Sequence, residues 1–98
     1  MSLFETGTVV MTPGIKSIMD RGTAEAEIIR DCLARHMRGD WGDLEEDDRR
    51  MNDESLVNER SGRLTDSLFS SYKTEFGDIY IITEIDRSAT TVLLPEEY

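Results

Sequence analysis

The sequence predicts an α+β domain, in which two to three N-terminal helices pack on a small antiparallel β-meander of three to four strands. In the first half of the chain, apolar residues recur every three or four positions, which is the period of a helix. From Ser67 onward the period changes to two, which is the period of a half-buried strand. The chain has 98 residues, the length of one small domain, so we expect a single unit over residues 1–98.

The N-terminal half begins with a short strand and two helices. Thr8–Met11 is a β-branched run that fits a short strand. Thr12 and Pro13 then resemble an N-cap followed by proline at the first helical position, and we expect a short helix there. The longest helical signal covers residues 24–38, with Gly39 placed to end it.

A third helix is expected from Leu44 into the fifties. Asp43 and Glu46 have the spacing of an acidic capping box, which predicts the start of this helix. Leu44, Met51 and Leu56 are its expected inward-facing residues.

The C-terminal half predicts a loop at 58–66 and strands at 67–73, 79–85 and 90–94. Connections this short require antiparallel neighbours, so the three strands form a meander. Helix 24–38 would cover one face of the sheet. The expected core residues are Ile28, Ile29, Leu33, Ile81, Val92 and Leu94.

Composition limits the class of protein. The chain is 38% hydrophobic and 33% charged, and no apolar stretch approaches the length of a membrane span. One cysteine, Cys32, cannot form an intramolecular disulfide, and the start of the chain lacks the features of a signal peptide. These features favour a reducing, cytoplasmic setting. No zinc, phosphate-loop or calcium pattern is present, so we expect no metal and no cofactor.

Negative charge is concentrated in one segment. Residues 40–54 carry eight carboxylates and two arginines, a net charge of −6 out of −10 for the chain. Helical residues rise by about 1.5 Å each, close to the axial charge spacing of about 1.7 Å in duplex DNA. The run is interpreted either as a surface that imitates phosphates, or as a solvated helix whose acids favour its N-terminal end. Its carboxylates are Asp40, Asp43, Glu45, Glu46, Asp47, Asp48, Asp53 and Glu54.

Three single residues have two interpretations each. His36, the only histidine, lies between Arg35 and Arg38. It is either an acid–base group acting on a phosphodiester or a structural residue of the core. Trp41 either closes the core or anchors an interface. Arg87, in the turn after Asp86, either belongs to the turn or is exposed to recognise phosphate or carboxylate.

The charges of the turns at 35–43 and 86–88 are complementary, so we expect the two turns to lie close together. Arg87 or Arg38 would then pair with Asp40 or Asp86. The residues predicted to bind a partner are Asp40, Trp41, Asp43, Glu45, Glu46, Asp47, Asp48 and Arg87, and no catalytic residue is predicted.

Two motifs carry a family resemblance: residues 35–43, with the sequence RHMRGDWGD, and residues 82–98, which begin ITEIDRS and end TTVLLPEEY. The chain resembles a family of small uncharacterised accessory proteins carried on bacterial plasmids, integrative elements and phages. The resemblance implies a mobile-element protein of the bacterial cytoplasm and supplies no catalytic residue.

The favoured function is an inhibitor, of the anti-restriction or anti-CRISPR kind, that imitates DNA and blocks a host complex with a basic nucleic-acid-binding groove. Such a protein would be no enzyme and would bind neither nucleic acid nor membrane directly. One alternative is a structural or regulatory subunit, with strand 90–94 as an edge that forms a homodimer. A second alternative is a small ribonuclease or toxin-like enzyme using Arg35, His36 and Arg87, which the charge of −10 disfavours.

Overall fold

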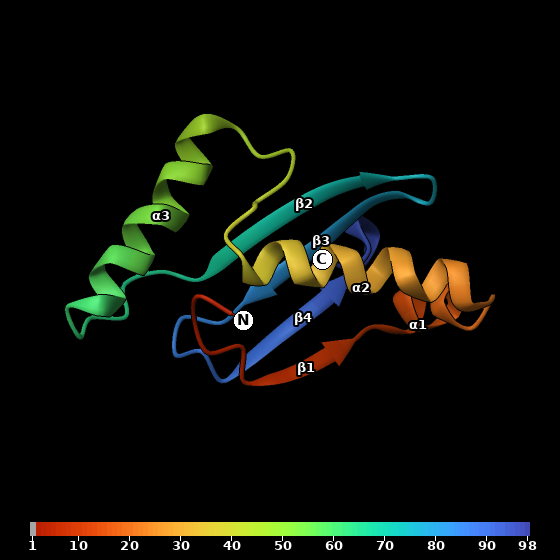
Figure 1. The fold of residues 1–98 in the computed structure, drawn as a ribbon, viewed down its shortest axis with the longest axis horizontal. Helices are drawn as coiled ribbons and strands as arrows, with labels where there is room; N and C mark the ends of the chain where they lie inside the picture. Colours follow the sequence, from red (N-terminus) through yellow and green to blue (C-terminus); the bar gives the residue numbers. More distant parts are fainter. Residues whose placement is uncertain (1) are drawn as a thin grey trace.

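The computed structural model describes residues 2–98 and confirms the α+β class (Figure 1). Three α-helices, four strands and a short 3₁₀ helix make up this part of the chain. In chain order they are β1 (Thr8–Met11), α1 (Pro13–Met19), α2 (Thr23–Met37), α3 (Glu46–Arg60), β2 (Leu68–Thr74), β3 (Gly77–Thr83), β4 (Ala89–Leu93) and η1 (Pro95–Glu97). None of the helices within residues 2–98 is long and apolar enough to cross a membrane.

The sheet has the order β1-β4-β3-β2. β2, β3 and β4 form the predicted antiparallel meander, whereas β1 pairs in parallel with β4. The parallel pairing is possible because the long connection through the three helices and two other strands returns the chain to β1 in the same direction. The prediction that strand 90–94 lies at a sheet edge is therefore wrong: β4 is paired on both sides, and β1 and β2 are the edges.

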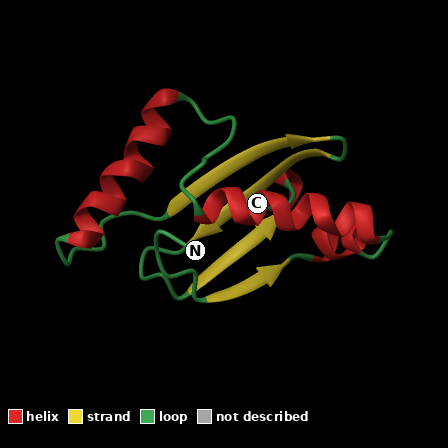
Figure 2. Cartoon of the chain, viewed as in Figure 1, coloured by secondary structure: helices red, strands yellow, loops and turns green. Residues whose placement is uncertain are grey.

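Helices α1 and α2 cover one face of the sheet and bury the main core against it (Figure 2). Ile29, Ile81 and Val92 are fully buried there, as predicted. Leu33 and Leu94 are half-buried and pack against this core. Ile28 is also only half-buried, because it lies about 100° around the helix from Ile29 and at the margin of the covered face.

Helix α3 lies apart from the other two, beside the β2 edge (Figure 1). A second core cluster includes Leu56 of α3. Its buried residues are Phe4, Trp41, Leu56 and Leu68, with Leu44 packed against them. Leu44 and Leu56 therefore face inward as predicted, but Met51 is 53% exposed. The inward face of α3 carries Asn52, Ser55 and Leu56 instead. These positions have helical spacing, but the face includes residue 52 in place of the expected residue 51. The helix continues to Arg60, so the loop predicted to start at residue 58 starts three residues later.

Candidate functional site

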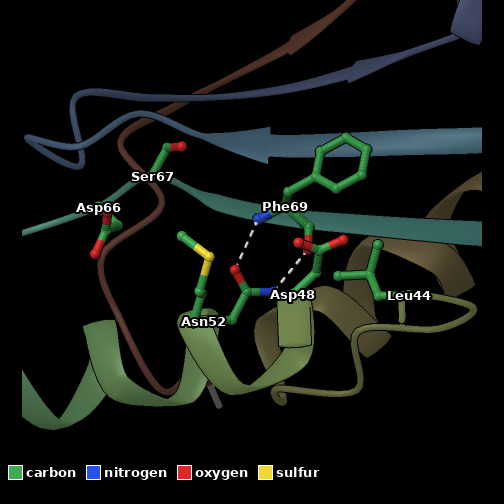
Figure 3. A pocket seen from close by; sticks show the side chains of 7 residues that line it. Leu44, Asp48, Asn52, Asp66, Ser67 and Phe69 are labelled. Atoms are coloured by element: carbon green, nitrogen blue, oxygen red, sulfur yellow. Dashed lines mark hydrogen bonds between the residues drawn. The ribbon is translucent and has the colours of Figure 1, made fainter. Parts of the chain in front are cut away.

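The polar inward face of α3 attaches the helix to the outer edge of β2. Asn52 Nδ2 donates to Phe69 O at 2.7 Å, and Phe69 N–H donates back to Asn52 Oδ1 at 3.3 Å. The amide thus takes the place of a further strand, pairing both backbone groups of Phe69 as Figure 3 shows. Next to it, Gly42 forms an isolated parallel bridge with Ser71. The chain itself therefore closes the β2 edge at Phe69 and Ser71.

Arg87 fixes the other end of α3. Its guanidinium pairs with Glu59 at 2.9 Å, donates to Ser55 Oγ at 3.1 Å and reaches Asp66 O at 2.8 Å. The residue is only 5% exposed and has a positive φ of 60°, unusual for a residue other than glycine. The prediction that Arg87 recognises a partner is wrong, because its fork is occupied by groups from α3 and two loops.

Trp41 is also buried, with 3% of its surface exposed, so it closes the core rather than meeting a partner. Its indole stacks on Phe4 and its Nε1–H donates to Asp53 Oδ1 at 2.9 Å. Asp53, one carboxylate of the acidic run, therefore accepts an intramolecular hydrogen bond. The interface interpretation of Trp41 is wrong, and the core interpretation is confirmed.

The expected pairing between the two turns is also wrong. Asp40 pairs with Arg35 at 2.7 Å, and this contact lowers the pKa of the Asp40 carboxyl. Asp86 accepts from Ser88 N–H within its own turn at 3.0 Å, as an ordinary turn residue does. Arg87 turns away to α3, so residues 35–43 and 86–88 belong to two separate polar clusters.

The acidic residues at the start of α3 are exposed as predicted. They are Glu45, Glu46, Asp47 and Asp48. Within residues 2–98, the only ion pair among them is Asp47–Arg50 at 3.6 Å, between side chains that are 89% and 61% exposed. A pair this exposed is weak. Asp43 is exposed too, while its backbone N–H donates to Ser71 O at 2.7 Å. Five of the eight predicted residues are therefore exposed carboxylates in the turn before α3 and in its first turn. We call this segment the acidic face: Asp43, Glu45, Glu46, Asp47 and Asp48.

A pocket of about 200 Å³ adjoins the acidic face, between α3 and β2 (Figure 3). Leu44, Met51 and Phe69 supply apolar lining, and Asp48 and Asp66 are its only charged residues. Neither carboxylate makes a side-chain hydrogen bond or ion pair within the described residues 2–98. The pocket thus combines an apolar lining with two unneutralised negative charges.

His36 lies in the core between α2 and the sheet and is fully buried. Its Nδ1 is hydrogen-bonded to Ser70 Oγ and its Nε2 to Thr83 Oγ1 at 2.9 Å. Burial lowers the pKa of the imidazole from 6.5 to about 4. Both ring nitrogens are bonded to hydroxyls of the chain itself, so the core interpretation of His36 is the one that the geometry supports.

Sequence reasoning missed the residues that hold α3 in place: Asn52, Ser55, Glu59 and Asp66. Three of them follow one helical stripe at positions 52, 55 and 59, with Leu56 on the same face. The polar side chains lie on the same side of the helix as Leu56, the buried leucine of α3. This shared face was the sequence signal that could have predicted their role.

Comparisons with known proteins identify no relative: no family model, no curated protein and no solved structure matches the chain. Within residues 2–98, no group of three or more His, Cys, Asp or Glu side chains is arranged to hold a metal ion.

Proposed function

We propose that the protein is a binding module that docks its acidic face onto a basic nucleic-acid-binding groove of a host complex and blocks it. The observation that supports this proposal is the exposure of Glu45, Glu46, Asp47 and Asp48, with only one weak ion pair among them. Like charges this close repel one another, so a surface of this kind gains free energy when cations approach. In the family that the chain resembles, the setting is a mobile element in the bacterial cytoplasm.

The attachment of α3 supports a role for the helix as a rigid ligand. Asn52 holds its middle to β2 and Arg87 holds its end through Glu59. A fixed helix keeps its exposed carboxylates at fixed positions around its first turn, so little entropy is lost when it binds.

The pocket beside the acidic face fits an arginine or lysine side chain of the partner. The aliphatic stem of such a side chain would pack on Leu44 and Met51. Its cationic end would meet Asp48 or Asp66, which lack intramolecular cations within residues 2–98. This combination favours a protein partner with basic side chains over a small neutral ligand.

The test compares two charge-reversed variants as baits in host cytosol. The first carries Glu46→Lys and Asp48→Lys on the acidic face. The second carries Glu75→Lys and Glu84→Lys, exposed residues of the sheet connections, and so has the same net charge. We expect the second variant to capture the same complex as the wild type and the first to lose it.

Titration of the captured complex then tests DNA mimicry. Binding should weaken steeply with salt, because screening at 0.15 M limits exposed charge interactions to about 8 Å. Duplex DNA should compete with the wild-type protein for the complex. Equal affinity of the acidic-face variant at low salt would show that the acidic run is only a solvated helix.

The ribonuclease-like alternative has no geometry in its favour, because His36 is buried and Arg35 and Arg87 are each paired with a carboxylate. The alternative of a self-associating subunit has one specific observation in its favour, the free edge of β1.

A further inference from the structure

The two edges of the sheet differ. The β2 edge is closed at Phe69 by Asn52 and at Ser71 by the bridge to Gly42. At the opposite edge, β1 pairs only with β4. Thr8, Val9 and Val10 are exposed there, and no charged residue, proline or bulge interrupts Thr8–Met11. Charges and prolines are the usual devices that keep an edge strand from pairing with another chain, and β1 has neither.

The hydrogen bonds of β1 define which backbone groups are free. Thr8 N–H donates to Ser88 O at 3.0 Å and Thr12 N–H to Val92 O at 3.1 Å, so even-numbered residues point their backbone groups toward β4. In a parallel ladder the intervening residues point the other way. The N–H and C=O groups of Val9 and Met11 therefore face outward, and no backbone group within residues 2–98 pairs with them across that edge.

We infer that this edge pairs with a second copy of the chain, as antiparallel β1 strands related by a two-fold axis through Val10. In this register Val9 lies opposite Met11 of the partner subunit, and each such pair exchanges two backbone hydrogen bonds. The symmetry repeats the pair on the other side of the axis, so all the outward groups of both strands are used. The result is a continuous eight-stranded sheet.

The side chains on the open face of the sheet fit this arrangement. Val9 and Met11 lie opposite Thr90 and Val92, which are buried under the helices, so Val10 points to the other face. There it continues a row with Thr91, Ile82 and Phe69, each directly opposite the next. Val10 is 42% exposed at the end of this row. Pairing across the axis places it against Val10 of the partner subunit and joins the two rows.

Charge favours this edge over any other for two acidic chains. α3 packs beside β2, at the edge opposite β1 (Figure 1). In an eight-stranded sheet the two copies of β2 would be about 34 Å apart, at about 4.8 Å per strand. That separation is several times the screening length of about 8 Å at 0.15 M salt, so the two acidic faces would not repel each other appreciably. Both acidic faces also stay free to bind a partner.

Analytical ultracentrifugation of the full chain tests the inference. A strand pair of four residues buries less area than a standard stable interface, so we expect a reversible dimer that forms between low micromolar and millimolar concentration. The mass should rise from 11.2 kDa toward twice that value. A wild-type protein that stays at 11.2 kDa throughout this range would overturn the inference.

Two variants separate this edge from other surfaces. Val9→Pro removes an outward N–H without removing a bond to β4, and Val10→Lys sets two like charges against each other at the axis. Both should stay monomeric, with an unchanged far-ultraviolet circular dichroism spectrum as the check on folding. Val57→Lys, at a valine of α3 that is even more exposed, should dimerise as the wild type does. Dimers of Val9→Pro and Val10→Lys as strong as the wild type would place the contact elsewhere and overturn the inference.

Discussion

His36 Nε2 lies 2.9 Å from Thr83 Oγ1 in the middle of the core, and the order of hydrogen bonds assigns the proton between them to the histidine. Thr90 Oγ1 donates its one proton to Thr6 O at 2.8 Å, so Thr83 must donate to Thr90 across their 2.7 Å contact. Thr83 can then only accept from His36. Neutral imidazole has one N–H, so its Nδ1 accepts from Ser70. The chain of bonds therefore fixes the proton on Nε2, and burial, which lowers the pKa to about 4, keeps the ring neutral at pH 7.

Stability should therefore fall as the pH is lowered toward 4. The pKa of His36 is about 4 in the folded protein and 6.5 when the ring is solvated, so between these values the unfolded chain binds the extra proton. The free energy of unfolding should decrease through this window by about 3 kcal/mol in total. Urea denaturation at pH 7, 6 and 5 measures the decrease. His36 is the only histidine, and Asp40, Asp86 and Glu97 have lowered pKa values, so the change above pH 5 is assigned to one group.

His36→Gln is the control for this pH dependence. Glutamine does not titrate, so the variant should lose the decrease between pH 7 and 5 even if it is less stable at every pH. A wild-type curve that is flat over this range would contradict the assignment of a buried neutral ring.

Asn52→Ala should destabilise the fold clearly, because the Asn52 side chain is buried against β2. The variant leaves the N–H and C=O of Phe69 without partners in a partly buried site, which costs about 1–3 kcal/mol. Met51→Ala, one residue earlier and 53% exposed, should cost much less. Urea denaturation of both variants gives the comparison. Equal losses would mean that water replaces the amide at the β2 edge.

The class of fold and most elements could be predicted because helical and strand periods are local properties of the sequence. The place of β1 could not be predicted, because Thr8–Met11 pairs with residues 89–92, some eighty positions later. That pairing also decides which strand is an edge. In the meander alone, one edge of β4 would have no partner strand. In the structure that edge pairs with β1.

The acidic face could be predicted because carboxylates at the start of a helix rarely have a reason to turn inward. The roles of Met51 and Arg87 could not be predicted from the sequence. Hydrophobicity favours Met51 as the inward residue, but the backbone of Phe69 requires the amide of Asn52, and the helix turns accordingly. Arg87 lies in a turn, and nothing near it in sequence reveals that Glu59, 28 residues earlier, receives its charge.

Arg87→Ala should be among the most destabilising substitutions in the chain. It leaves the partly exposed Glu59 without its cation and removes donors to the backbone at Asp66 and Glu84, a loss of about 3 kcal/mol, the lower end for a buried pair. Glu59→Gln, which keeps an acceptor for the guanidinium, should cost less. Amide hydrogen exchange at residues 55–67 should accelerate more than exchange at β3 and β4. Uniform acceleration over the whole chain would contradict a local anchoring role.

Gly42→Ala and Gly62→Ala form a matched pair that tests the closure of the β2 edge. Both glycines have positive φ, 75° and 88°, so both variants carry the backbone penalty of about 1–2 kcal/mol that a side chain brings to this region. At Gly62 the added methyl group meets nothing within 4 Å, whereas at Gly42 it would lie 2.1 Å from Ser71 O. Gly42→Ala must therefore break the bridge to β2 as well, and its loss of stability should be clearly larger.

The fluorescence of the neighbouring Trp41, the only tryptophan, reports the same event. Its indole is 3% exposed in the folded protein, so opening of the 40–43 turn should shift the emission to longer wavelength and expose the ring to iodide. We expect that change in Gly42→Ala and not in Gly62→Ala. Identical spectra and equal free energies of unfolding for the two variants would show that the bridge contributes nothing, because the backbone penalty is common to both.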